Sequence, residues 1–214
     1  MERIVHFEQA GVSLGGRKVL TGLDLSVSPG ESVGVVGPNG SGKTTLTRAA
    51  ATLLKTDSGS TTVLGVDPAT GDPTRIRRSI GLIGHQPSLI GELTLTENLN
   101  HFTRLATGDM TGVSKALDVV GLRDAADRRA SACSFGMQRR AEIAHLLLSK
   151  PRLLLLDEAA AGLDESARDL VEALVRSVRE RSGGVIVVSH DRSQLESLCD
   201  TIATLERGRL TGSA

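Results

Sequence analysis

Residues 37–45 read Gly-Pro-Asn-Gly-Ser-Gly-Lys-Thr-Thr, which is the most informative motif in the sequence. As a pattern it is G-x-x-x-x-G-K-T, which is typical of loops that hold the phosphates of nucleoside triphosphates. Its glycines let the backbone curl until successive N–H groups point inward at phosphate oxygens. The flexible stem of Lys43 is long enough to reach the β- and γ-phosphates, and the Thr44 hydroxyl is a ligand for Mg²⁺. The predicted nucleotide contacts are Gly37, Pro38, Asn39, Gly40, Ser41, Gly42, Lys43, Thr44 and Thr45.

The sequence on either side of the loop favours the same interpretation. Residues 32–36 are a short valine-rich run, as expected for a buried strand. Leu46, Ala49, Ala50 and Leu53 follow the loop at helical spacing. The loop is therefore expected to join a strand to the N-terminus of a helix, where the helix dipole favours anions. A glycine-rich turn that matches the pattern by chance is the alternative, and these flanks argue against it.

The composition of the whole chain narrows the class of protein. It has 214 residues with a formal net charge of zero, and 39% of them are hydrophobic, as in soluble globular proteins. A neutral chain does not favour nucleic-acid binding, and three Phe with no Tyr or Trp leave little for stacking on bases. Cys133 and Cys199 form no C-x-x-C pair and are expected to be reduced thiols. No nucleic-acid partner is expected.

No segment of the sequence is predicted to enter a membrane. Residues 1–6 hold no apolar signal segment, and no apolar run approaches the ~20 residues that a membrane span requires. The chain is therefore expected to be cytoplasmic, and any work at a membrane requires a separate partner.

Apolar runs and capping signals divide the chain into strands and helices. Continuous apolar strands separated by helices are typical of a parallel sheet that is covered on both faces. A turn is expected at 58–60, and capping boxes are expected at 94–97 and 193–196. Strands are expected within 3–36 and at 61–64, 79–84, 153–156, 185–188 and 201–206, and helices at 94 to about 130 with a break at 108–112, at 134–149 and at 165–182.

Two adjacent carboxylates follow the apolar run 153–156. Asp157 is suited to hold Mg²⁺, directly or through water. Alternation along the strand turns Glu158 another way, where its carboxylate would accept a proton from an attacking water. An acidic strand end that faces solvent is the alternative, and the phosphate loop earlier in the chain argues against it.

Further motifs follow in an order that resembles the nucleotide-binding subunit of ATP-binding-cassette (ABC) transporters, over nearly the whole chain. Gln86 lies in Gly-His-Gln-Pro, where this family has its glutamine loop. Residues 134–140, Ser-Phe-Gly-Met-Gln-Arg-Arg, resemble the family signature in a variant with S-x-G-M in place of S-G-G-Q. Residues 161–164 resemble the D-loop, and His190 in Val-Ser-His-Asp matches the switch histidine.

The resemblance implies a role for each motif. Ser134 and Gly136 would face the γ-phosphate bound by a second copy of the chain, in a head-to-tail dimer with two ATP molecules at its interface. Gln86 would contact Mg²⁺ or the lytic water and would report nucleotide occupancy to integral membrane subunits. His190 would hold the γ-phosphate and orient Glu158. Ser134 also stands at a predicted helix start, which is a natural anion site, whereas a lone histidine after a strand is more often structural.

The resemblance also implies the architecture. The expected fold class is α/β, a three-layer P-loop nucleoside-triphosphatase fold with an N-terminal antiparallel β subdomain and an inserted α-helical subdomain. A single domain, 1–214, would comprise a nucleotide-binding core at 3–86 and 151–214 and a helical subdomain at about 87–150 that carries the signature. The chain would lie on the inner face of the cell membrane, held there by its partner subunits.

The chain departs from the family pattern at three positions. Leu14 stands near the place where the family usually has an aromatic residue that stacks on adenine, so we expect aliphatic contact and a weak preference for ATP over GTP. Ala159 replaces the usual proline after the catalytic glutamate, where only a small backbone effect is expected. Phe135 replaces a glycine of the signature, although Ser134 and Gly136 are retained. No catalytic position is missing, so the chain is expected to hydrolyse ATP.

Residues 84–102 suggest the class of transporter. Gly-His-Gln-Pro followed by L-T-x-x-E-N-L is similar to the ATPase subunit of the haem exporter used in cytochrome c maturation. The alternative is an ATPase for a drug, lipid or polysaccharide exporter, because T-x-x-E-N-L also occurs across many cassette ATPases. A soluble ABC ATPase of DNA repair or translation is a third interpretation, disfavoured by the absence of a heptad run, the single cassette and the neutral charge. A P-loop kinase is disfavoured by the signature and the switch histidine.

Overall fold

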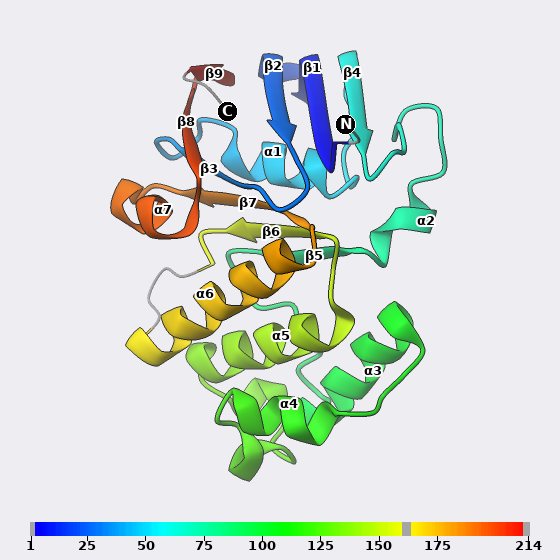
Figure 1. The fold of residues 1–214 in the computed structure, drawn as a ribbon, viewed down its shortest axis with the longest axis vertical. Coiled ribbons are helices and arrows are strands. Elements are labelled where there is room, and N and C mark those ends of the chain that lie inside the picture. The colour runs from blue at the N-terminus through cyan, green and yellow to red at the C-terminus, as the bar shows by residue number, and fades with distance from the viewer. Residues whose placement is uncertain (1–2, 160–163, 212–214) are drawn as a thin grey trace.

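The computed structural model describes residues 3–159 and 164–211, which form two sheets and the helices around them (Figure 1). The strands are β1 (Val5–Leu14), β2 (Arg17–Val27), β3 (Ser32–Val36), β4 (Ser58–Val63), β5 (Ile80–Ile83), β6 (Leu153–Asp157), β7 (Gly184–Ser189), β8 (Thr201–Glu206) and β9 (Arg209–Thr211). The helices are α1 (Lys43–Ala50), α2 (Thr74–Arg77), α3 (Leu95–Thr107), α4 (Val113–Val119), α5 (Phe135–Ser149), α6 (Glu165–Glu180) and α7 (Arg192–Leu198), with short 3₁₀ turns at Arg123–Ala125 and Ala130–Ala132.

The larger sheet has the strand order β5-β6-β7-β3-β8-β9 and is parallel except for the β8–β9 pair. Every residue of β6 and β7 is buried, because the sheet is covered on both faces. Alternation along β6 sends Leu155 into the core shared with α1 and the smaller sheet, and Leu156 into the core shared with α5 and α6. The parallel sheet predicted from the apolar runs is confirmed.

The smaller sheet has the order β2-β1-β4 and is antiparallel throughout. Figure 1 shows α1 between the two sheets, and α5 and α6 on the opposite side of the larger one. The helices α3, α4 and α5 enclose a third core of their own, which includes Leu99, Leu117 and Ala144. The expected α/β architecture, with an N-terminal antiparallel sheet and an α-helical insertion, is confirmed.

Local signals predicted some boundaries and missed others. The capping box at the start of α3 is confirmed, since Thr94 Oγ1 accepts from the Glu97 N–H at 3.1 Å and Glu97 Oε2 accepts from the Thr94 N–H at 2.8 Å. The capping box at 193–196 is wrong. The N-cap of α7 is Asp191, which accepts from the Ser193 N–H at 2.9 Å, while Glu196 instead pairs with Arg192 at 3.2 Å.

Two further expectations about the first half of the chain are wrong. Residues 58–60 are the first residues of β4 rather than a turn, because they pair with β1. Leu53 does not continue the buried face of the first helix, because α1 ends at Ala50, and the Leu53 side chain is 55% exposed. The short elements α2 and β9 were not expected. No helix in the described part of the chain is long and apolar enough to cross a membrane.

His145 makes stability depend on pH at the junction of the helices and the larger sheet. Burial on α5 lowers the pKa of His145 to about 4, from an ordinary value near 6.5. The folded chain therefore prefers the neutral ring. The stabilisation that the neutral His145 ring gives the folded state is fully present above about pH 6.5 and is lost as the pH falls towards 4. The lost free energy of unfolding is about 3 kcal/mol.

We therefore expect His145→Gln to lose less stability between pH 6.5 and 4 than the unchanged protein, as measured by urea unfolding at each pH. His101→Gln, at an exposed position on α3, is the matched control and should follow the unchanged protein. Equal pH profiles for all three proteins would contradict the role of His145.

Candidate active site

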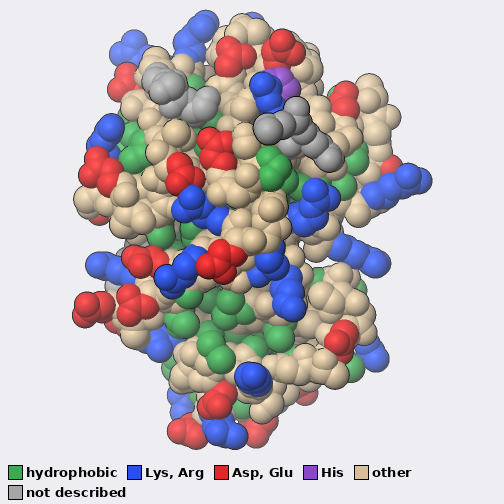
Figure 2. Space-filling view, in the orientation of Figure 1, with side chains coloured by type: hydrophobic (Ala, Val, Ile, Leu, Met, Phe, Trp, Pro, Cys, Tyr) green, Lys and Arg blue, Asp and Glu red, His purple; other side chains and the backbone are tan. Residues whose placement is uncertain are grey.

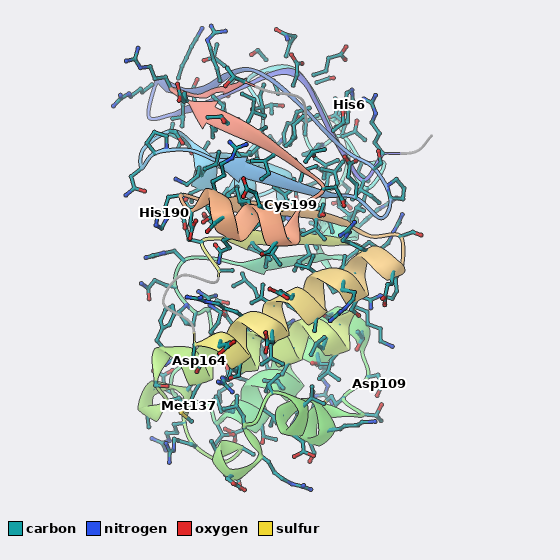
Figure 3. All side chains as sticks on the ribbon, turned by 60° about the vertical axis from the view of Figure 1, so that its left-hand side comes forward. His6, Asp109, Met137, Asp164, His190 and Cys199 are labelled. Carbon is teal, nitrogen blue, oxygen red and sulfur yellow. The ribbon has the colours of Figure 1, made fainter. Side chains whose placement is uncertain are left out.

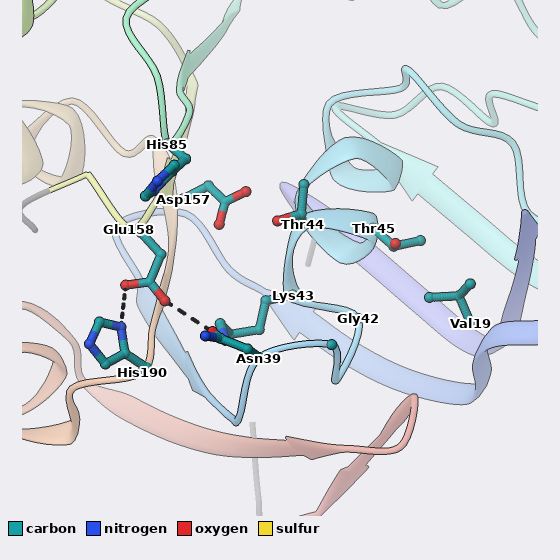
Figure 4. Close-up of a pocket in the computed structure, with 11 residues that line it drawn as sticks. Val19, Asn39, Gly42, Lys43, Thr44, Thr45, His85, Asp157, Glu158 and His190 are labelled. Carbon is teal, nitrogen blue, oxygen red and sulfur yellow. Dashed lines mark hydrogen bonds and ion pairs between the residues drawn. The ribbon is translucent and has the colours of Figure 1, made fainter.

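A cavity of about 490 Å³ lies where the strands β3, β6 and β7 end (Figure 4). The carboxyl ends of parallel strands are the usual place for a ligand site in α/β sheets. Residues from the phosphate loop, the end of β6 and the end of β7 line it together, although they are far apart in the sequence. The lining residues are Val19, Asn39, Gly40, Gly42, Lys43, Thr44, Thr45, His85, Asp157, Glu158 and His190.

The phosphate loop lies between β3 and α1, as predicted, and its glycines are required by its backbone. Gly42 has a φ of 112°, in the left-handed region that side chains disfavour. A Cβ on Gly37 would stand 2.3 Å from the carbonyl oxygen of Leu205, so that only glycine fits between the loop and β8. The buried Ser41 hydroxyl has no hydrogen-bond partner among the described residues. The loop therefore holds polar groups that are available to a ligand.

Lys43 is the cation of the cavity. Its side chain is 93% buried and folds back over the loop, where Nζ donates to the carbonyl oxygens of Gly37 at 2.7 Å and Pro38 at 3.2 Å. The same nitrogen lies 3.8 Å from Glu158 Oε1. A buried ammonium with neutral carbonyl partners and one carboxylate is suited to receive a phosphate group.

Asp157 ends β6 as a buried carboxylate opposite Thr44 (Figure 4). Burial raises the pKa of Asp157 above its ordinary value, and the negative charge of Glu158 raises it further, while Thr44 and Lys43 act in the opposite direction. Burial thus disfavours the charged form of the Asp157 carboxyl in the ligand-free chain. A cation bound beside it would favour that charged form.

The fit to Mg²⁺ rests on donor chemistry. The Thr44 hydroxyl and the Asp157 carboxylate are the hard oxygen donors that Mg²⁺ prefers, and both line the cavity. Among the described residues no group of three or more His, Cys, Asp or Glu side chains could hold a metal ion. Mg²⁺ usually takes one or two carboxylates and completes its shell with water and phosphate, so the Asp157 carboxylate and the Thr44 hydroxyl are a sufficient protein donor set.

Glu158 is held in a conformation that local sequence does not favour. Its φ is 54°, a left-handed value that costs a non-glycine residue about 1–3 kcal/mol. Its N–H donates to the carbonyl oxygen of Val188 at 3.0 Å, which extends the β6–β7 pairing by one residue. The turned backbone places Glu158 Oε2 at 2.8 Å from His190 Nδ1. Such strain is expected where the position of a side chain matters more than stability.

The other predicted site residues lie outside this cavity. Gln86 is exposed and is adjacent to His85, which does line the cavity. Leu14 ends β1 with 41% of its side chain exposed, and Val19 of β2 lines the cavity in its place. His85 and Val19 were not predicted. The only signal for either was its closeness in sequence to a predicted residue.

The signature residues also lie away from the cavity of their own chain. Ser134 is the N-cap of α5 and accepts from the Met137 N–H at 3.3 Å. Figure 3 shows Met137, in the same first turn of α5, well separated from His190. Asp164 of the predicted D-loop is the N-cap of α6 and accepts from Arg140 at 2.9 Å, while 161–163 lie outside the described residues.

Three comparisons relate this chain to known proteins. A family model described as ABC transporter matches residues 20–161. The chain is 35% identical over 209 residues to the Nod factor export ATP-binding protein I of Rhizobium etli. It is 37% identical over 199 residues to the daunorubicin/doxorubicin resistance ATP-binding protein of Streptomyces peucetius. These alignments cover 96% and 91% of this chain but only 66% and 60% of the relatives, so the chain spans less than two thirds of their length.

Solved structures agree with this result. An ATP-binding cassette dimer in a post-hydrolysis state, bound to ADP and Pi, has a TM-score of 0.87 and 25% identity, with 97% of each chain covered. A bacterial Atm1-family ABC exporter with ATP bound has a TM-score of 0.85 and 27% identity over 97% of this chain and 38% of that one.

The raised pKa of Asp157 leads to a prediction about the ligand-free protein. When folding raises the pKa of a carboxyl, the free energy of unfolding falls as the pH rises through that pKa, because the buried group must then carry a charge. The Asp157→Asn variant has no such charge and should therefore be more stable than the unchanged protein at pH 7. We expect a melting temperature a few degrees higher than that of the unchanged protein without nucleotide. With Mg²⁺ and ATP added, the unchanged protein should gain more than the variant. A lower melting temperature of ligand-free Asp157→Asn would contradict the cost assigned to this charge.

Proposed function

The chain belongs to the ABC transporter family, and we propose that it binds and hydrolyses ATP to power export by a separate membrane subunit. The family resemblance read from the motifs is confirmed at this level. The observation that carries the proposal is the single cavity in which the phosphate loop, Asp157, and the Glu158–His190 pair meet. A site that only binds the phosphates of a nucleotide would need the phosphate loop but not the Glu158–His190 pair.

The contacts of Lys43 and Glu158 suggest how ATP would be held and attacked. Lys43 would exchange its carbonyl partners for the β- and γ-phosphates, which are stronger acceptors because they are charged. This would also release Glu158 from its 3.8 Å contact with Lys43. Glu158 would then accept a proton from the attacking water while His190 keeps its carboxylate in position. The rest of catalysis is positioning and neutralisation of phosphate charge.

In this proposal Thr44 and Asp157 would hold Mg²⁺, and Gln86, which is exposed outside the cavity, would join them only by turning towards it. The ion would supply Lewis-acid neutralisation of the phosphate oxygens. Asp157 contributes the buried charge that attracts it, and Thr44 contributes a neutral oxygen at the start of α1.

A second copy of the chain would complete the site. Ser134 and Gly136 lie at the start of α5, outside their own cavity, so in this proposal they contact a nucleotide bound by another copy. A Cβ on Gly136 would meet no described atom within 4 Å, so packing inside its own chain does not explain the glycine. Close approach of a ligand does explain it. We therefore propose a head-to-tail dimer with two ATP molecules at its interface.

The adenine contact differs from the usual aromatic stack in this proposal. Val19 lines the cavity and Leu14 is exposed nearby in sequence, so aliphatic side chains would cover the base. Dispersion contact alone does not distinguish adenine from guanine, which fits a weak preference for ATP over GTP.

Export of the Nod-factor or drug type is the class we propose. The haem-export interpretation of residues 84–102 has no support from the relatives reported above, whose names specify Nod factor export and drug resistance. The alternative of a drug, lipid or polysaccharide exporter fits them better. A soluble ABC ATPase without a transport role fits them less well, for the same reason.

A groove of about 320 Å³ between β5, α3 and α5 is the contact we propose for the membrane subunit. Phe102, Leu105 and Leu146 contribute apolar lining, and Arg77 and Arg78 contribute positive charge. This pattern suits an amphipathic segment with an acidic residue. Figure 2 shows further hydrophobic side chains gathered over α4 and α5 on the face turned to the viewer. The chain would thus be peripheral on the inner face of the membrane.

Two substitutions separate nucleotide binding from hydrolysis. Glu158→Gln should keep ATP affinity and lower kcat by about 10²–10⁴, because the proton acceptor is lost. Lys43→Ala should weaken ATP binding by roughly tenfold to a hundredfold, because a buried charge no longer meets the phosphates. Calorimetric titration with ATP and a phosphate-release assay measure the two effects. Full turnover by Glu158→Gln would overturn the assignment of the base.

The groove and the class of exporter can be tested together. The full-length chain, purified from membranes, should bring with it an integral membrane subunit of a drug or Nod-factor type of exporter. Leu105→Glu should abolish this association and keep ATP binding, because a charge is placed in the apolar groove. Val119→Glu is the control, since Val119 is also 57% exposed but lies on α4, outside the groove. Haem-handling partners would restore the first interpretation.

A further inference from the structure

Arg139 on α5 is the largest fully buried side chain in the described part of the chain, and none of its surface is exposed. Its Nη1 lies 2.7 Å from Glu142 Oε2, one turn further along the same helix. Glu142 is 94% buried. A charged pair at this depth requires an explanation, because ordinary core positions are apolar.

The pair holds the backbone of residues 84–88, which we call the glutamine loop. Arg139 Nη2 donates to the carbonyl oxygens of Gly84 at 2.8 Å and His85 at 3.0 Å. Glu142 Oε1 accepts from the Ser88 N–H at 2.7 Å and from the Ser88 hydroxyl at 2.8 Å. The loop is thus fastened at both ends, on either side of Gln86.

Stability alone does not account for this arrangement. Burial lowers the pKa of Arg139 and raises that of Glu142, so each charge is held at a cost in desolvation. Apolar residues of similar size often stabilise a protein as well as a buried ion pair does, or better. What they cannot do is fix the direction and distance of a backbone segment, which charge-assisted hydrogen bonds do.

Arg139 also contacts the start of its own helix. Its guanidinium lies 5.3 Å from the ring centroid of Phe135, the first residue of α5 and the neighbour of Ser134. A cation over an aromatic face is attracted to it. One side chain therefore connects the signature, at the start of α5, with the loop that carries His85 into the nucleotide cavity.

We propose that Arg139 and Glu142 are positioning residues for ATP hydrolysis, which lock the glutamine loop to the signature helix so that His85 stays in the cavity and the backbone of Gln86 is held beside it. Because of this lock, the glutamine loop moves together with α5. A displacement of α5 caused by another copy that contacts Ser134 would therefore also displace His85 in the cavity of this chain. The proposal rests on the function proposed above, and the experiment is designed so that the two can fail separately.

The test replaces the pair by apolar residues of similar size in the full-length chain. Arg139→Met with Glu142→Leu should keep or raise the melting temperature and leave ATP affinity unchanged. The kcat should fall roughly tenfold to a hundredfold, because a displaced catalytic group loses its alignment. Arg123→Met with Asp118→Leu is the control, since that pair is exposed on the surface of the helices, and should change neither quantity.

A double-mutant cycle with Gln86→Ala decides whether the lock acts through Gln86. If it does, the apolar pair in the Gln86→Ala background should lower kcat no further than Gln86→Ala alone. Multiplicative losses, or an unchanged kcat for the apolar pair, would overturn the proposal. If the apolar pair fails to fold, Arg139→Lys enters the same cycle, because an ammonium keeps the charge without the planar geometry that reaches both carbonyls.

Glu158→Gln separates the two proposals. If that variant retains full turnover, the proposed ATPase mechanism fails whatever the cycle shows. If Glu158→Gln is inactive and the cycle is multiplicative, only the lock is wrong.

Discussion

The parallel register of β3, β7 and β6 is the constraint on which the site depends. In this ladder Val36 pairs with Ser189, and Asp157 pairs with Val188. The three strands therefore end at one edge of the sheet, and the next residues of each, the phosphate loop, Glu158 and His190, meet there. Because the register is set by backbone hydrogen bonds between buried strands, a slip of one residue would turn Asp157 and Glu158 to the wrong sides.

Several residues of the cavity are held in conformations or environments that lower the stability of the ligand-free chain. The Asp157 carboxyl is buried, which raises its pKa, and Glu158 has a left-handed backbone, although neither feature stabilises the ligand-free fold. Arg139 and Glu142 repeat the pattern deeper in the molecule, where a charged pair stands in place of apolar packing. In each case a polar group is placed where a nucleotide or a neighbouring segment would meet it. Function and stability thus compete at the same few positions.

The strands of the larger sheet and the main motifs of the cavity could be predicted where a short stretch of sequence specifies them. A run such as 153–156 can be buried only as a strand or helix core, and the glycines of 37–42 permit the tight left-handed turns that a phosphate loop needs. The capping box at Thr94 was also local and correct. That at Ser193 failed because Asp191, two residues earlier, competes for the same N–H group. Residues 58–60 were misjudged because their strand partner is β1, distant in sequence.

The family, the phosphate loop, the carboxylates at the end of β6 and the histidine after β7 follow from sequence patterns alone, because each motif is short and has a fixed chemistry. The folded chain was needed to show that His85 and Val19 line the cavity, that Leu14 and Gln86 lie outside it, and that Arg139 and Glu142 hold the glutamine loop. These contacts join residues tens of positions apart. No local pattern encodes them, because they depend on how the smaller sheet and α5 pack against the larger sheet.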